Sequence, residues 1–323
     1  MRYLNPKADL TFKKVFGEHP DLIRSFLNAL LPFETPEEEI DELEYLPAEL
    51  VPETPMKKNS IVDVRCRDRK GRQFIVEMQM LWSPAFMQRV LFNASKAYVR
   101  QLGGREKYEL LQPVYSLNLV NDVFEPDVEE YYHDYRIVCM EHTEKVIDGL
   151  RFIFVELPKF KPHSFHEKKM QVLWLRYLTE IDEHTRQIPQ ELLDNPDIRK
   201  AVGQIEESAF SDAQLWGYDD FWDAVRVENT LISDAVHKGM AQGMAQGMAQ
   251  GMAQGMAQGM AQGMAQGMAK GMEQGMAKGM EQGEVQGRQN ERLEMARRMK
   301  SDGLPIEVIA KYTQLTEEEI KGI

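Results

Sequence analysis

The pattern of apolar positions predicts a helical start to the chain. Between residues 9 and 31, apolar side chains recur at spacings of three and four, which places them on one face of an α-helix. They are Phe12, Val15, Phe16, Leu22, Ile23, Phe26, Leu27 and Leu30. Pro20 interrupts this pattern. Because a proline inside a helix removes a backbone hydrogen bond, we expect the helix to break near it.

A β-hairpin is predicted next. Residues 59–81 read NSIVDVRCRDRKGRQFIVEMQML, with apolar runs on both sides of the turn-like sequence DRKG at residues 68–71. Further strand-like runs occupy residues 113–120, 135–140 and 152–157, and helical patterns occupy residues 85–102, 168–181, 197–209 and 213–232. This mixture of elements predicts an α/β domain.

A glycine repeat follows this domain. From residue 239 to residue 287, glycine occupies every fourth position, thirteen times in all, mostly in the tetrad GMAQ. Met, Ala and Gln favour helix, but each glycine costs about 1 kcal/mol relative to alanine, so an isolated helix would be marginal. An extended form and a flexible chain are the alternatives. The three-residue spacing of Lys270 and Glu273, and of Lys278 and Glu281, favours helix over the extended form.

The last segment has conventional helix signals. Residues 288–300 predict a charged helix, Pro305 starts a short second one, and Thr316 with Glu319 forms a capping-box pattern. Three consecutive acids at residues 317–319 would repel phosphate, so we expect a terminal segment that mediates oligomerisation and not a DNA-binding helix-turn-helix. The expected organisation is a domain over residues 1–238, a repeat over 239–287 and a helical tip over 288–323.

The hairpin carries the most specific candidate chemistry. Asp63 lies late in its first predicted strand, while Glu77 and Gln79 lie two residues apart in the second and therefore share a face. A neighbouring strand can aim Asp63 at the same point. Two convergent carboxylates form a hard-oxygen site of the kind that holds Mg²⁺ beside a phosphate. A polar group at residue 79 would then position the attacking water or the scissile phosphate.

With these residues in place, the chain resembles the recombination-promoting nucleases, a transposase-related branch of the PD-(D/E)XK nuclease superfamily. The resemblance includes KADLTFKKVFG at residues 7–17 and the acid followed by Glu-x-Gln in the hairpin. It continues through Phe86, Arg89, Phe92, Ser95, Tyr98, Gln101, Leu102 and Tyr108, the glycine repeat, and Ile309, Ala310 and Leu315. It implies a restriction-endonuclease-like core with a helical or flexible repeat tail. It also implies a DNA endonuclease with a role in recombination, mobile elements or defence.

The resemblance further implies roles for individual residues. Asp63 and Glu77 would hold Mg²⁺, for which Mn²⁺ can substitute, with help from the backbone carbonyl of Met78. Gln79 stands where the wider superfamily usually has Lys. An amide can orient water but cannot add positive charge, so catalysis is either slower or recruits a cation from elsewhere.

The predicted helix over residues 85–102 offers such cations. Arg89, Asn93, Lys96 and Arg100 are spaced by four, three and four residues, which places them on one helical face. We assign Lys96 to catalysis, and Arg89 and Arg100 to DNA binding.

Two further sets of candidate ligands are weaker. Asp9 precedes the first helical pattern and fits either a helix N-cap or an additional metal ligand, and both interpretations stay open. His163 and His166 form a short pair without further ligand spacing, which predicts a surface loop.

Charge and cysteine content limit the partners. Residues 1–238 hold 30 Lys and Arg against 42 Asp and Glu, so contact with DNA requires a local basic patch and should be salt-sensitive. Only Cys66 and Cys139 occur, and no apolar signal or membrane-length run is present, which predicts a reduced cytoplasmic protein without a membrane partner. We expect DNA as substrate and a homo-oligomer formed through the tail. The alternative, favoured by Gln79, is a catalytically weak interaction or regulatory protein.

Overall fold

The computed structural model of this protein describes residues 2–50, 60–103, 106–162 and 169–323. The chain divides into two compact units, Met1–Asp234 and Ala235–Ile323. The predicted loop with His163 and His166 lies outside the described residues.

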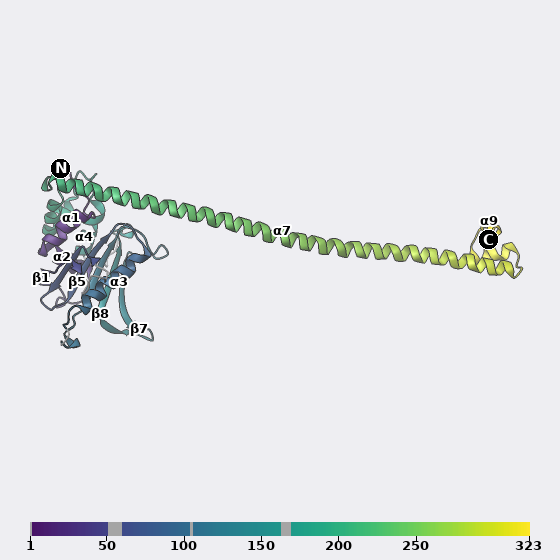
Figure 1. The fold of residues 1–323 in the computed structure, drawn as a ribbon, viewed down its shortest axis with the longest axis horizontal. Coiled ribbons are helices and arrows are strands. Elements are labelled where there is room, and N and C mark those ends of the chain that lie inside the picture. Colours follow the sequence, from purple (N-terminus) through teal and green to yellow (C-terminus); the bar gives the residue numbers. More distant parts are fainter. Residues whose placement is uncertain (1, 51–59, 104–105, 163–168) are drawn as a thin grey trace. The chain divides into compact units, whose positions relative to one another are not determined.

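A six-stranded mixed sheet forms the centre of the first unit (Figure 1). Its strands, in spatial order, are β1 (Leu43–Tyr45), β4 (Val64–Asp68), β5 (Gln73–Gln79), β6 (Val114–Val120), β8 (His142–Glu156) and β7 (Tyr132–Cys139). Neighbouring strands β5, β6 and β8 are parallel, and antiparallel pairs flank them on both sides. A separate two-stranded sheet joins β2 (Glu49–Leu50) to β3 (Ser60–Ile61). The predicted α/β class is therefore confirmed.

Helices pack on both faces of the large sheet. The main core joins α1 (Asp9–Glu18), α2 (Pro20–Leu30), α4 (Lys169–Glu180) and α6 (Pro196–Gln204) to alternate strand residues such as Phe74 and Val76. On the other face, Ile75 packs with Ala94 and Ala97 of α3 (Pro84–Val99). The shorter helices are α5 (Gln190–Leu193) and the 3₁₀ turns Tyr108–Leu110, Leu157–Lys159 and Glu207–Ala209. Because side chains alternate along β5, Glu77 and Gln79 lie on the α3 face with Ile75.

Local sequence explains the predicted break and turn, and both predictions are confirmed. α1 ends at Glu18 and α2 begins at Pro20, where the missing N–H has no helical partner to lose. Gly71 closes the β4–β5 hairpin with a φ of 85°, a conformation that glycine adopts without steric cost. Asp68 braces the turn by accepting hydrogen bonds from the backbone N–H of Arg72 (2.9 Å) and from its Nε (2.7 Å).

The first strand of the hairpin differs from the prediction. The expected continuous strand is two strands, β3 and β4, with a bend at Asp63 between them. Asp63 therefore lies before β4 and not late in a strand. The reason is a change of partner, since β3 pairs with β2 whereas β4 pairs with β1 and β5.

The repeat is helical in the second unit, so neither the flexible nor the extended alternative describes it. Helix α7 (Asp212–Ser301) includes all thirteen tetrad glycines. An added Cβ at each of these glycines would meet nothing within 4 Å, and the methionines at residues 240–280 are 63–73% exposed. The repeat helix therefore has no packing partner among the described residues.

The end of α7 carries a small core of its own. Helices α8 (Ile306–Thr313) and α9 (Glu317–Gly322) pack with it around Ala296, Ile309 and Ile320. The predicted capping box of Thr316 and Glu319 is present at the start of α9.

Two further features bear on the sequence predictions. Among the described residues, no helix has the combined length and apolar character needed to cross a bilayer. Cys66 is buried, Cys139 is exposed, and both thiols are free.

Candidate active site

The hairpin brings Asp63 and Glu77 together. Val64 of β4 pairs with Val76 of β5 in an antiparallel register, so the residue before Val64 lies beside the residue after Val76. The backbone N–H of Met78 donates to Oδ2 of Asp63 (2.8 Å) and fixes this carboxyl against the end of β5. The side chain of Glu77 is only 7% exposed and that of Asp63 is 23% exposed. The two acids therefore form a largely buried pair.

Burial raises the pKa of both carboxyls, and their hydrogen-bond and ion-pair partners do not offset this effect. It raises the pKa of Glu77 to about 7, and the charge of Asp63 adds to this effect against the hydrogen bond from Asn93 and the charge of Arg89. Burial also raises the pKa of Asp63, although the N–H of Met78 and the charge of Lys13 favour its ionised form. A divalent cation between them would stabilise both charged forms.

A cation approaches from each side of the sheet. From α1, Nζ of Lys13 lies 3.9 Å from Oδ1 of Asp63 and 2.6 Å from Oδ1 of Asp9. From α3, a guanidinium nitrogen of Arg89 lies 3.6 Å from Oε2 of Glu77. Sequence reasoning missed Lys13, although its position four residues after Asp9 places both residues on one helical face.

Gln79 connects Arg89 to the end of β5. Its Oε1 accepts a hydrogen bond from Arg89 (2.7 Å), and its Nε2 donates to the carbonyl oxygen of Leu81 (2.7 Å). Arg89 also lies over the ring of Phe86, with the guanidinium carbon 4.9 Å from the ring centroid. The amide thus holds a guanidinium beside Glu77.

The donor atoms around the pair suit a hard cation. Asn93, which sequence reasoning placed only on a helix face, donates from Nδ2 to Oε1 of Glu77 (2.9 Å), and its buried Oδ1 has no hydrogen-bond partner. The N–H and C=O of a strand residue point to the same strand edge, so the carbonyl of Met78 lies, like its N–H, on the β4 edge of β5. The atoms that could bind a metal here, namely the two carboxylates, the carbonyl of Met78 and Oδ1 of Asn93, are all oxygens, the ligand type that Mg²⁺ prefers. The described residues contain no group of three or more His, Cys, Asp or Glu that could hold a metal, so such an ion would depend on two carboxylates and neutral oxygens.

The other candidate residues lie around this pair. Ala8 is the N-cap of α1, so the N-cap interpretation of Asp9 is wrong; Asp9 is the first helical residue and pairs with Lys13. The ammonium of Lys96 donates to the carbonyl oxygen of Leu50, and its catalytic role stays a prediction. Arg100 is the C-cap residue of α3, and its contact with DNA also stays a prediction.

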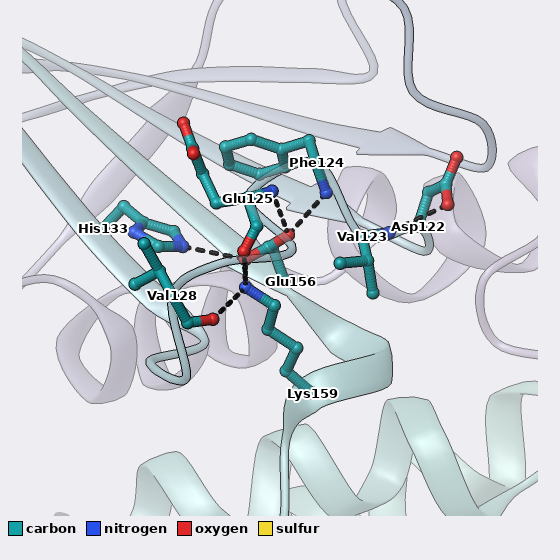
Figure 2. A network of polar contacts seen from close by, with 8 residues as sticks. All are labelled: Asp122, Val123, Phe124, Glu125, Val128, His133, Glu156 and Lys159. Carbon is teal, nitrogen blue, oxygen red and sulfur yellow. Dashed lines mark hydrogen bonds and ion pairs between the residues drawn. The ribbon is translucent and has the colours of Figure 1, made fainter.

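A second buried acid, Glu156, ends β8 and has a full set of donors (Figure 2). Its Oε1 accepts from the backbone N–H groups of Phe124 (2.6 Å) and Glu125 (3.1 Å). Its Oε2 lies 2.9 Å from Nε2 of His133 and pairs with the ammonium of Lys159. Burial acts to raise the pKa of Glu156, but these donors outweigh it and the pKa is lowered.

This network anchors a loop near the start of α3. Lys159 also donates to the carbonyls of Glu125 (2.6 Å) and Val128 (2.7 Å), which ties the loop to the end of β8. Within the same loop, Asp122 accepts the backbone N–H of Trp82 (2.9 Å), and Phe124 stacks on Trp82 with ring centroids 4.2 Å apart. Glu156 is therefore a structural acid, and no sequence motif indicated it.

Comparison with known proteins agrees with this geometry. A family model described as PD-(D/E)XK nuclease family transposase matches residues 6–235, which include both carboxyls and α3. The comparisons with curated proteins and with solved structures found no match. The family expected from the sequence is confirmed, and the mixed sheet with helices on both faces agrees with the expected restriction-endonuclease-like core.

Proposed function

The chain belongs to the PD-(D/E)XK nuclease family transposases, and we propose that it is a Mg²⁺-dependent DNA endonuclease that hydrolyses phosphodiester bonds. The observation that carries this proposal is the buried pair of Asp63 and Glu77, with the backbone N–H of Met78 donating to Asp63. These residues would hold Mg²⁺ or Mn²⁺, which supplies positive charge to a phosphate and favours ionised water at neutral pH. By resemblance, the biological role lies in recombination, mobile elements or defence.

The side chains around the pair have complementary tasks in this proposal. Arg89 binds a phosphate oxygen of the substrate and contributes the positive charge that Gln79 lacks. Gln79 is a positioning residue, since its hydrogen bond to Arg89 holds the guanidinium beside Glu77. Lys13 contributes a second positive charge beside Asp63, and its pairing with Asp9 fixes its direction. Lys96 and Arg100 extend the positive charge along α3 toward flanking phosphates.

Plasmid cleavage tests the proposal directly. The full chain incubated with supercoiled plasmid and Mg²⁺ should produce nicked DNA, EDTA should stop the reaction, and Mn²⁺ should restore it. Asp63→Asn should be inactive while remaining folded. Glu44→Gln is the matched control, because this exposed acid of the same sheet pairs with Arg67 and should be dispensable. No cleavage by the wild-type chain under any metal would favour the alternative, a catalytically weak interaction protein.

We also propose that α7 mediates self-association. Thirteen glycines in a helix cost on the order of 10 kcal/mol relative to alanine, and no contact among the described residues compensates for them. The exposed methionines and the close approach that glycine permits supply such contacts when a second copy packs against the helix.

Truncation after His237 separates assembly from chemistry. The shortened chain should sediment as a smaller species and still nick plasmid, but it should make fewer double-strand breaks because two sites are needed to cut both strands. An unchanged mass would contradict the assembly role. Complete loss of nicking would mean that the tail is required for the site itself.

A further inference from the structure

Helix α3 differs in charge from the unit that contains it. Residues 1–238 carry 42 acidic against 30 basic residues, yet α3 and its C-cap carry Arg89, Lys96 and Arg100 and no acid at all. Burial and the neighbouring charge of Arg100 both lower the pKa of Lys96. A helix of one charge sign in an acidic domain is suited to a polyanion.

An exposed aromatic ring lies between these cations. Phe92 is 44% exposed, follows Arg89 by three residues and precedes Lys96 by four, so the three side chains share one helical face. The ammonium of Lys96 lies 5.5 Å from the centroid of the Phe92 ring. Along the helix axis, Phe92 is about 4.5 Å beyond Arg89, and Lys96 is about 6 Å farther. Arg89 itself lies 3.6 Å from Glu77, so this face begins at the carboxylate pair.

We propose that Phe92 is a stacking platform for an unpaired nucleobase beside the scissile phosphate, which makes single-stranded or locally unpaired DNA the preferred substrate class. Arg89 and Lys96 bind the phosphates on either side of that base. Alternating cations and aromatic rings bind single strands because every base has a π face. A base inside a duplex presents its faces to its neighbours, so a paired substrate must first be unstacked. This inference deepens the endonuclease function proposed above and rests on it.

Binding to matched oligonucleotides tests the platform without a knowledge of the cut site. The probes are oligothymidine, an abasic strand of the same length and charge, and a fully paired duplex, each titrated by fluorescence anisotropy with the full-length chain in EDTA. Phe92→Ala should weaken binding to oligothymidine about tenfold, a typical stacking contribution, and should leave binding to the abasic strand within twofold. Phe92→Trp, which keeps an aromatic ring at this position, should bind oligothymidine as tightly as the wild-type chain. The matched control is Leu91→Ala, because Leu91 is equally exposed at 47% and cannot stack on a base.

Different results would overturn different claims. Equal losses in Phe92→Ala on oligothymidine and on the abasic strand would refute base stacking. Equal losses in Leu91→Ala and Phe92→Ala, with a change of sedimentation mass, would identify the face as a protein interface instead. The substrate class would be refuted if the wild-type chain cut single-stranded and paired DNA at equal rates and Phe92→Ala cut both at the wild-type rate. The endonuclease function would still stand in that case. Wild-type chain that neither binds nor cuts any DNA would refute the function itself.

Discussion

Glu77 and Glu156 are both buried carboxyls on parallel strands of one sheet, yet their surroundings have opposite effects. Glu77 has one hydrogen bond from Asn93, a guanidinium at 3.6 Å and a second acid nearby, and its pKa is raised to about 7. Glu156 has two backbone N–H donors, a histidine and a lysine, and its pKa is lowered.

This difference distinguishes an acid of the candidate active site from an acid that stabilises the fold. A buried acid whose oxygens are all occupied by donors is stable as it stands, and it transfers that stability to the loop it holds. The pair of Asp63 and Glu77 has fewer donors, and a buried pair of this kind is costly when ionised unless a cation from solution joins it. Glu77 therefore has the character of a ligand, and Glu156 has the character of an anchor.

The largest expected effect is on cleavage. Glu77→Gln and Asp63→Asn should each lower Mg²⁺-dependent nicking at least about 100-fold, because several kcal/mol of transition-state stabilisation depend on the ion they hold. Glu156→Gln should retain nicking at a temperature where it is folded. Plasmid assays on the three purified variants measure this contrast, and full activity in Glu77→Gln would refute its assignment as a ligand.

For stability we expect the opposite contrast, with the larger loss on substitution of Glu156. Glu156→Ala leaves Lys159 and two loop N–H groups without their carboxylate, and we expect it to lower the free energy of unfolding by about 3 kcal/mol. Urea denaturation followed by circular dichroism gives this value. Glu129→Ala is the control, because Glu129 is an exposed acid of the same loop. A loss no larger than that of the control would mean that the network contributes little to stability.

The pH dependence of stability should differ in sign between the two acids. Between the ordinary pKa of 4.5 and the folded-state pKa of about 7, folded Glu77 keeps a proton that the unfolded chain has lost, so its contribution to stability falls as pH rises through this window. The lowered pKa of Glu156 makes its contribution fall as pH decreases below the unfolded value. In EDTA at pH 8, Glu77→Gln should therefore be more stable than wild type, by about 3 kcal/mol.

Chemical denaturation at pH 5 and pH 8 checks this difference. The gain should shrink toward pH 5, where wild-type Glu77 is protonated. Mg²⁺ should raise the melting temperature of the wild-type chain more than that of Glu77→Gln. A variant less stable than wild type at pH 8 in EDTA would contradict the raised pKa of Glu77.

The smallest expected effect concerns Gln79, which holds Arg89 in place. Gln79→Ala removes the hydrogen bond that holds the guanidinium, and we expect kcat to fall about tenfold with little change in Mg²⁺ affinity. Gln79→Glu, which can still accept from Arg89, should recover part of the rate. Isothermal calorimetry with Mg²⁺ separates the two roles, since a large loss of metal affinity in Gln79→Ala would place Gln79 among the ligands.

The sequence by itself determined the elements whose causes are local. Pro20 fixed the break between α1 and α2, and Gly71 with Asp68 fixed the hairpin turn, because these depend on backbone conformation within a few residues. The turn then set the antiparallel register that places Asp63 beside Glu77. Strand alternation placed Gln79 on the same face. The pair at the centre of the site could therefore be found without a structure.

The tertiary structure decided which side chains from distant elements reach that pair. Lys13 arrives from α1 and Asn93 from α3, on opposite faces of the sheet, and their approach depends on helix packing that no local pattern encodes. The bend at Asp63 followed from strand pairing across separate sheets. Glu156 had no sequence signal, because its donors come from a loop some thirty residues away. Burial and long-range charge set the pKa of each acid, and both are properties of the folded chain alone.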